Sequence, residues 1–226
     1  MAPDLARTVL IAIAATGAVT WLIALRFLIN SFSSKEAPGQ KRMDRLDPET
    51  RRIGEVLQGS ALVEGRPADL SAKAATILVK ERNGPLGWMK ILERSGDRIR
   101  FEGAGGPAGS QNVCRVGRGE LQFTASGGDR TEVRYRVELA GGRWLLWLGM
   151  LFQTLGAAAL VVGFWALNQF AVEHPDAGVR GQVFQMFHAV HFLWPPFLVG
   201  GLYRFGRSSL RARCDTLIHN LPFYEE

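Results

Sequence analysis

Two histidines, His188 and His191, are the residues of this chain whose type and spacing most readily suggest chemistry. They lie in the stretch FQMFHAVHFLWPPFLVGGLY, residues 184–203. Imidazole can ligate haem or another tetrapyrrole, bind a metal ion, or pass a proton through a membrane. Gln185, His188 and His191 step by three and so share one side of a helix. A haem bracketed from both sides needs another histidine on a facing helix, and the other two long apolar runs of the chain contain none.

Hydrogen bonding between helices is the simpler interpretation of this polar stripe. A polar side chain in hydrocarbon needs a partner. The second apolar run supplies Gln153, Thr154 and Asn168 as partners. We therefore expect His188 and His191 to join helices, with a tetrapyrrole or metal ligand, or a proton or substrate path, as the alternatives.

Three uncharged runs are the elements that must position these side chains. They cover residues 8–25, 144–170 and 183–203 and contain 18, 27 and 21 residues. A helix of roughly 20 apolar residues, at about 1.5 Å per residue, crosses a hydrocarbon core of about 30 Å. The chain is therefore predicted to have three transmembrane helices. Pro195-Pro196 lack two backbone donors, so the third helix is expected to be kinked or broken.

The first run has a second interpretation, a cleaved secretory signal, because Arg7 precedes it. A small-x-small cleavage site should follow a complete apolar core, whereas Ala12-Ile13-Ala14 comes only four residues into this one. A retained membrane anchor is therefore the prediction.

Small residues recur at helical spacing in the second run. Gly149, Gly156 and Gly163 are seven residues apart, and Ala159 and Gly163 are four apart. Glycines on one helical face allow another helix to approach closely, so these four residues are predicted to form a helix-packing face. The first run has Ala14 and Ala18 at the same four-residue spacing.

Basic residues flank the apolar runs unequally. The segment 31–52 after the first run carries six, and the segment after the third run carries four: Lys35, Lys41, Arg42, Arg45, Arg51 and Arg52, then Arg204, Arg207, Arg211 and Arg213. The loop at 172–182 carries only Arg180. Basic loops stay in the cytoplasm, so the amino terminus and this loop are predicted outside, and residues 31–143 and the tail inside, at the inner (cytoplasmic) membrane. The net charge of +6 suits anionic lipid headgroups and requires no nucleic acid.

Between the first two runs, the chain reads as a small α+β domain. VLQGSALVEG, residues 56–65, has strand character, and Pro67 suits a first helical turn. In the helix that follows, the spacing of the apolar residues predicts one buried face: Leu70, Ala74, Ile77 and Leu78.

The period then changes to two, which indicates antiparallel strands. Two short strands are expected on either side of Ser95-Gly96-Asp97, and two more on either side of Gly127-Gly128. In TEVRYRVEL the apolar positions alternate with charges, which predicts a sheet with one buried and one solvated face. In the tail, helical spacing predicts a helix packed on this domain, with Leu210, Leu217, Ile218 and Leu221 as its apolar residues.

The order of these elements resembles the START/polyketide-cyclase helix-grip superfamily. A strand, a helix, antiparallel strands ending in TEVRYRVEL and a final amphipathic helix carry the resemblance, over residues 56–142 and 207–221. In that superfamily a curved sheet wraps a long carboxyl-terminal helix. Here the apolar runs within residues 144–203 interrupt the fold. Members commonly bind lipids or other apolar ligands, and the resemblance implies such binding.

Catalytic residues are hard to find in the soluble part. All four histidines lie at position 174 or later, and the acidic residues mostly alternate with basic ones on exposed strand positions. GAGGPAG, residues 103–109, leads into further strand and not into a helix, so a flexible loop is expected and not a phosphate cradle. Cys114 and Cys214 are expected to be reduced, buried thiols. An enzyme, a structural metal and a catalytic site are not predicted.

The sequence therefore predicts a membrane protein with three transmembrane α-helices and a small cytoplasmic α+β domain built on an antiparallel sheet. Its segments are an external amino terminus (1–7), helix (8–30), basic linker (31–52), soluble domain (53–142), helix (143–171), external loop (172–182), kinked helix (183–203) and tail helix (204–226). The expected function is a non-catalytic binding or assembly subunit that packs in the lipid bilayer against other membrane subunits or itself. The alternatives are a hydrophobic-ligand or lipid binding protein and a cofactor-bearing redox or pigment-binding component.

Overall fold

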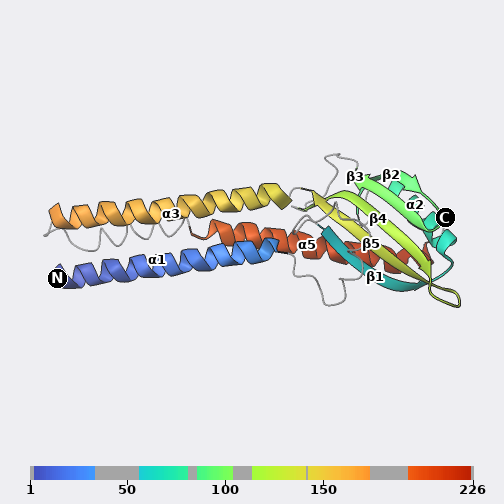
Figure 1. The fold of residues 1–226 in the computed structure, drawn as a ribbon, viewed down its shortest axis with the longest axis horizontal. Helices are drawn as coiled ribbons and strands as arrows, with labels where there is room; N and C mark the ends of the chain where they lie inside the picture. Colours follow the sequence, from blue (N-terminus) through green and yellow to red (C-terminus); the bar gives the residue numbers. More distant parts are fainter. Residues whose placement is uncertain are drawn as a thin grey trace. The chain divides into compact units, whose positions relative to one another are not determined.

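The computed structural model describes residues 3–33, 56–80, 86–103, 114–140, 142–173 and 193–224. The chain divides into two compact units. Unit 1 comprises Met1–Ser34 and Arg143–Leu202, and unit 2 comprises Lys35–Gly142 and Tyr203–Glu226. Within the described residues there are four α-helices and one five-stranded sheet (Figure 1). The helices that could cross a membrane belong to unit 1, and the sheet belongs to unit 2.

Unit 1 is built on two long apolar helices, α1 (Pro3–Phe32) and α3 (Gly142–Glu173). Their segments Ile11–Phe32 and Gly142–Ala166 are long and apolar enough to cross a membrane. They match the first two predicted spans. The third predicted span, residues 183–203, lies outside the described residues as far as position 192. The described part of the chain therefore contains two candidate spans and not three.

The last long helix, α5 (Pro195–Asn220), begins at the double proline. Proline suits a first helical turn, where its missing N–H would have no helical partner. The Phe197 N–H donates to the Trp194 carbonyl at 2.9 Å. No proline follows until Pro222, so the helix continues through Tyr203 and supplies residues to both units. The predicted division between a span ending at 203 and a tail helix starting at 204 is therefore not a helix end.

Unit 2 contains the predicted antiparallel sheet, which is confirmed and has five strands. They are β1 (Val56–Glu64), β2 (Met89–Arg94), β3 (Arg98–Gly103), β4 (Arg115–Ala125) and β5 (Arg130–Ala140). Their order is β1-β5-β4-β3-β2, so the first strand pairs with the last and β1 and β2 form the two edges. The turns between β2 and β3 and between β4 and β5 fall at the glycine-containing segments predicted to join strands.

One face of this sheet is the core of unit 2. In β5, the alternate residues predicted to be inward are all buried: Val133, Tyr135, Val137 and Leu139. The helix α2 (Pro67–Lys80) buries the predicted face: Leu70, Ala74, Ile77 and Leu78. Ser71, also buried, donates a hydrogen bond to the Ser95 carbonyl at 3.1 Å and so ties α2 to the β2–β3 turn.

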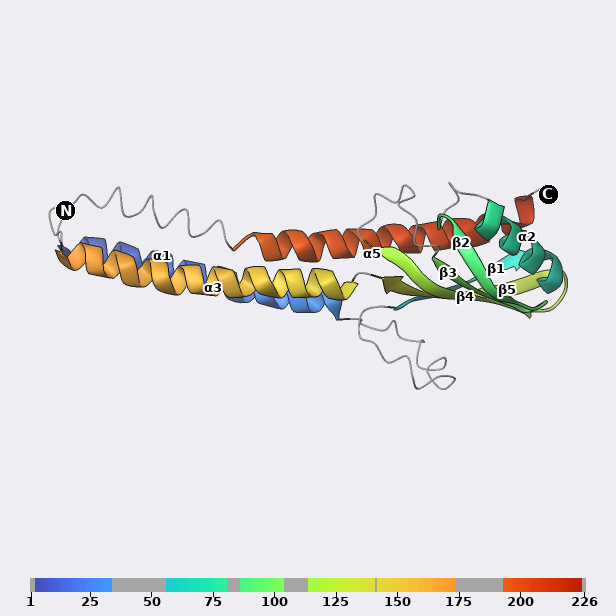
Figure 2. The same cartoon turned by 90° about the horizontal axis from the view of Figure 1, so that it is seen from above.

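The second half of α5 and the short 3₁₀ helix η3 (Leu221–Phe223) complete this core. Figure 2 shows α2 and this half of α5 on the same side of the sheet. The tail residues predicted to be apolar contacts are buried: Leu210, Leu217, Ile218 and Leu221. The Lys73 ammonium donates to the Pro222 carbonyl at 3.1 Å, which joins α2 to η3. Two helices that are far apart in the sequence, α2 and the second half of α5, therefore cover one face of the antiparallel sheet.

Candidate functional site

The predicted site residues fall into two groups. His188 and His191 lie outside the described residues. The helix-packing residues Gly149, Gly156, Ala159 and Gly163 all lie on α3, where Gly149 and Gly156 are buried and the other two are half-buried. The geometry of the α1–α3 contact is therefore the part of the predicted site that the structure describes.

Gly149 lies where a side chain would collide with two other helices of unit 1. A Cβ atom there would be 2.6 Å from Leu28 Cδ1 on α1 and 3.3 Å from Val199 Cγ1 on α5. Towards the other end of the pair, a Cβ atom at Gly17 would be 2.8 Å from Leu160 Cδ2. Glycine at these positions permits the close approach that van der Waals packing between apolar helices requires.

On α1, the residues that pack are spaced by seven, as on α3. Gly17, Ala24 and Ser31 are all buried. Ala14 is half-buried and Ala18 is exposed, so that pair does not form the inward face of α1. The repeat of Gly17, Ala24 and Ser31 is the sequence signal that matches the repeat on α3. A repeat of seven on both helices favours a long contact, because 3.5 residues per turn keeps one face of each helix towards its partner.

The middle of the α1–α3 contact holds a reciprocal pair of hydrogen bonds. The indole Nε1 of Trp21 donates to the Gln153 main-chain carbonyl at 2.9 Å, and Gln153 Nε2 donates to the Trp21 main-chain carbonyl at 2.7 Å. The side chain of Gln153 is 3 % exposed. Its oxygen Oε1 has no hydrogen-bond partner within the described residues. With Gly149 against Leu28 and Leu160 against Gly17, this pairing makes the two helices antiparallel.

Substitutions at Gln153 should separate the effect of losing a hydrogen bond from the effect of burying a charge. Gln153→Leu loses one hydrogen bond but also removes the oxygen that lacks a partner, so unfolding free energy should fall by less than about 1 kcal/mol. Gln153→Glu puts a carboxylate in the same buried place and should cost about 2 kcal/mol or more at neutral pH. Titration with a denaturing detergent, followed by circular dichroism, measures both. A charge effect requires the loss in Gln153→Glu to shrink near pH 4, where the carboxyl is protonated; an equal loss at both pH values would contradict it.

The first turns of α5 pack on the carboxyl-terminal end of α1 in unit 1. A Cβ atom at Gly200 would lie 2.8 Å from Phe27 Cε1 and 3.0 Å from Ser31 Oγ. The rings of Phe27 and Phe197 are 5.5 Å apart between centroids and tilted by 38°. Three helices thus meet near Leu28, and each contact uses a glycine or an aromatic ring.

In unit 2, two aromatic rings lie over glycines of the neighbouring strand. Tyr135 is paired with Gly59, where a Cβ atom would be 2.5 Å from Tyr135 Cε1. Phe101 is paired with Gly119, where a Cβ atom would overlap the Phe101 ring. Both rings are buried. Such pairs fill the space above a glycine and fix which residues of the two strands face each other.

Tyr135 also joins the sheet to α5. Its hydroxyl donates to Asp215 Oδ1 at 3.0 Å. Burial, then the hydrogen bond to Asp215 and its charge, raise the pKa of Tyr135 well above the ordinary value of 10.0. Burial, followed by the charge of Asp215, raises the pKa of the neighbouring Cys214 thiol from 9.0 to about 12. Both groups are therefore neutral throughout the physiological pH range.

These two groups predict a loss of stability at alkaline pH. A pKa that is higher in the folded state stabilises the fold below the unfolded value, and this contribution is lost as pH rises through the folded value. The free energy of unfolding should therefore fall progressively between pH 9 and about 12. Urea unfolding of wild type and of Cys214→Ala and Tyr135→Phe, at about pH 8 and about pH 10.5, measures this. Each variant should lose less stability between the two pH values than wild type; equal losses would refute the assignment.

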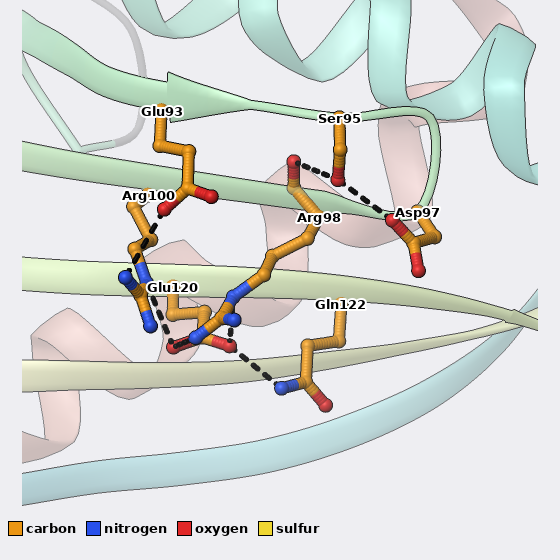
Figure 3. A network of polar contacts seen from close by, with 7 residues as sticks. All are labelled: Glu93, Ser95, Asp97, Arg98, Arg100, Glu120 and Gln122. Atoms are coloured by element: carbon orange, nitrogen blue, oxygen red, sulfur yellow. Dashed lines mark hydrogen bonds and ion pairs between the residues drawn. The ribbon is translucent and has the colours of Figure 1, made fainter.

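The outer face of the sheet carries an ionic network, drawn in Figure 3. Glu120 Oε1 is 2.7 Å from Arg98 Nε in an ion pair, and Glu120 Oε2 accepts a hydrogen bond from Arg98 Nη2 at 2.9 Å. Gln122 Nε2 donates to Glu120 at 2.6 Å, and Arg100 bridges Glu120 and Glu93. Partial burial alone would raise the pKa of Glu120, but these hydrogen bonds and the arginine charges outweigh it and lower the pKa.

Because its pKa is lowered, the Glu120 carboxylate is ionised at neutral pH. It can therefore keep its ion pairs with Arg98 and Arg100, which join neighbouring strands on the outer face of the sheet. A general acid near neutrality needs the opposite shift. Within the described ranges, no group of three or more His, Cys, Asp and Glu is placed to bind a metal ion. Cys114 and Cys214 are free, buried thiols. The chemistry that the described residues offer is hydrogen bonding, ionic contact and close packing.

Comparison with protein-family models, with curated proteins and with solved structures found no match to this chain.

Proposed function

We propose that this chain is a membrane-anchored, non-catalytic binding or assembly subunit, with unit 1 in a lipid bilayer and unit 2 as its soluble binding part. The observation that carries the proposal is the distribution of exposed apolar residues in unit 1. α1 and α3 use their glycine-containing faces for each other and leave large apolar side chains exposed elsewhere. Such faces need lipid or another apolar surface to cover them.

The tryptophans of α3 support a bilayer as that cover. Trp144 and Trp147, near the start of the helix, are 67 % and 74 % exposed, and Trp165 is 63 % exposed. Between the two ends most exposed residues are apolar and include Leu151, Leu155 and Val162. The exception is Thr154, whose hydroxyl donates to the Met150 carbonyl of the same helix at 2.9 Å. From Trp144 to Trp165 the helix rises about 31 Å at 1.5 Å per residue, close to the thickness of a hydrocarbon core. Exposed tryptophans at both ends of an apolar helix are typical of membrane–water interfaces.

The position of the third span and the orientation belong to the same proposal. The exposed side chains are apolar at Trp194, just before α5, and at Leu198 and Leu202 in its first turns. These turns pack on α1 through Gly200, as expected for the end of a third span. The basic residues that follow the first and third spans favour a cytoplasmic location for unit 2, at the cytoplasmic membrane.

The filled interior of unit 2 favours binding at its surface over binding of a ligand inside it. We propose that this unit is a small helix-grip fold, because β1 pairs with the last strand and α5 lies on the inner face. The inner face is filled by large, fully buried side chains from the sheet and both helices: Leu70, Leu78, Ile99, Phe101, Leu121, Tyr203, Leu217 and Ile218. A lipid carrier needs this volume for its ligand, whereas an assembly subunit needs only a stable surface.

Native mass spectrometry of the chain, extracted in mild detergent from its own membranes, tests the assembly function. Co-purifying protein subunits are the expected result. A chain without protein partners would overturn the assembly role, and a stoichiometric lipid or tetrapyrrole mass in place of a subunit would favour one of the alternatives.

Orientation has a separate test, because both native thiols are buried. Gly96 is exposed, with nothing near its Cβ position, so a Gly96→Cys variant provides one accessible thiol. A membrane-impermeant maleimide should label it only after the cells are permeabilised. Labelling in intact cells would place unit 2 outside and refute the proposed orientation.

A further inference from the structure

One charged side chain lies within the apolar part of α1. Arg26 is the only charged residue of the candidate span Ile11–Phe32, and α1 continues for six residues beyond it. In those six residues Leu28 and Ser31 are buried, whereas Arg26 is exposed. The arginine therefore belongs to the part of α1 that packs in unit 1, on the side that faces away from the other helices.

The neighbours of Arg26 on the surface of α1 are mostly apolar. Residues three and four positions apart are neighbours on a helix, which for Arg26 are Leu22, Ile23, Ile29 and Asn30. The three apolar side chains and Asn30 are all exposed. Arg26 therefore leaves the helix on an outward apolar surface, with Asn30 as its one polar neighbour.

Free hydrogen-bond donors are concentrated at these two side chains. The hydroxyls of Ser31 and Ser33 donate to main-chain carbonyls of α1, at 2.7 and 2.8 Å, so their hydrogens are used within the helix. The side chains of Arg26 and Asn30 make no hydrogen bond or ion pair within the part of the chain that the structure describes. Guanidinium and carboxamide both supply several N–H donors. A charged donor in apolar surroundings needs an acceptor, so the group that meets Arg26 must carry oxygen atoms and a negative charge.

The position of Arg26 along α1 places it close to a membrane–water interface. Leu28 lies against Gly149 of the antiparallel helix α3. Arg26 comes two residues before Leu28, and Trp147 comes two residues before Gly149, so they lie on opposite sides of this contact, about 6 Å apart along the helix axes at 1.5 Å per residue. Trp147 is exposed and marks the interface in the proposed arrangement. From about one turn inside that level, an arginine can extend its charge to the lipid headgroups.

We propose that Arg26, with Asn30 beside it, binds the phosphate of an acidic phospholipid in the cytoplasmic leaflet. The guanidinium matches two phosphate oxygens, and the acyl chains lie along Leu22 and Ile23, which are further from the interface. The negative charge of that leaflet favours an acidic lipid. A carboxylate on a partner helix would suit an arginine nearer the middle of the span. This inference rests on the membrane location in the proposed function and adds a ligand class and the residues that hold it.

Native mass spectrometry of the full chain in mild detergent, with phosphatidylglycerol added, tests the site. Phosphatidylcholine is the lipid control, because its headgroup carries no net charge. Arg26→Gln should weaken binding of phosphatidylglycerol by about fivefold or more relative to phosphatidylcholine, which is the effect of one basic residue near the interface. Arg26→Lys keeps the charge and should stay within about twofold of wild type. Asn30→Leu removes a neutral donor and should lose less than Arg26→Gln.

Arg66→Gln is the matched control, because Arg66 is an exposed arginine of unit 2 outside both candidate spans. It changes the net charge equally and should bind both lipids as wild type does. Equal losses in Arg66→Gln and Arg26→Gln would mean that net charge alone attracts the lipid, and would overturn the site. Displacement of the lipid by inorganic phosphate at the same concentration would also overturn it, because the ligand would then be a free anion.

Two further outcomes separate the site from the proposed function. Unchanged lipid binding in Arg26→Gln would overturn the site, and retention of the chain in membranes during alkaline carbonate extraction would leave the membrane anchor standing. Release of the wild-type chain by carbonate would overturn both. Loss of a co-purifying protein subunit in Arg26→Gln, with lipid binding unchanged, would assign Arg26 to a carboxylate of that subunit and overturn the lipid site alone.

Discussion

A leucine in place of Gly149 should lower the free energy of unfolding of unit 1 by about 2 kcal/mol or more. The reason is the space around the glycine. Even a Cβ atom would be 2.6 Å from Leu28 Cδ1, and Leu28 is fully buried. The Leu28 side chain cannot rotate into solvent. Val199 Cγ1, which would be 3.3 Å from the added Cβ atom, blocks a second direction. The added side chain must therefore push α1 and α5 away from α3. Titration with a denaturing detergent, followed by circular dichroism, measures the loss.

Gly201→Leu is the matched control for this substitution. Gly201 lies in α5, and a Cβ atom there meets nothing within 4 Å. A helical leucine is intrinsically more favourable than glycine by somewhat less than about 1 kcal/mol, so this variant should be neutral or slightly more stable. If Gly149→Leu is as stable as Gly201→Leu, the close contact of the three helices at Gly149 is not required for stability. The assembly function would then lose one of its structural supports.

A valine in place of Gly119 should destabilise unit 2 by about 3 kcal/mol or more. Gly119 lies in β4 opposite Phe101 of β3, and a Cβ atom there would overlap the Phe101 ring. Phe101 is fully buried in the core, so the ring has no free space to enter. Valine ordinarily favours strands. A loss of stability in Gly119→Val would therefore indicate overlap with the Phe101 ring and not a low strand propensity. Urea unfolding followed by tyrosine and tryptophan fluorescence measures it.

A second substitution should recover part of this loss if the ring is its cause. Phe101→Leu together with Gly119→Val removes the overlapping ring, so the double variant should be less destabilised than the sum of the two single variants. Gly96→Val, in the open turn between β2 and β3, serves as the control and should change stability by less than about 0.5 kcal/mol. Additive losses in the double variant would mean that the pairing of Phe101 with Gly119 does not determine the cost.

Local patterns in the sequence were sufficient to identify most elements. The spacing of Leu70, Ala74, Ile77 and Leu78 identified the buried face of α2, and the alternation in TEVRYRVEL identified the inner face of β5. Both patterns arise within one element, where side-chain direction follows from the period of the helix or strand alone. The two apolar runs of α1 and α3 could be recognised in the same way, from length and composition.

The start and extent of α5 were less accessible. α5 begins at Pro195-Pro196. The predicted kink or break of a third span at this point stays a prediction, because residues 174–192 lie outside the described residues. The change from apolar to basic residues after Tyr203 suggested a second boundary, but the helix continues to Asn220. The polarity of the side chains reflects what surrounds a helix and does not determine where its backbone hydrogen bonds end. A helix that passes from one unit to the next can therefore change composition without ending.

The sequence by itself determined the helices, the strands and the faces that they bury, because each depends on neighbours along the chain. Only the tertiary structure decided the partners. Trp21 and Gln153 exchange two hydrogen bonds although 132 residues separate them, and Tyr135 lies over Gly59 and reaches Asp215. The pairing of β1 with β5, the first strand with the last, places β1 at an edge of the five-stranded sheet. Several partners satisfy the same local pattern, and the choice among them depends on shape and packing between distant segments.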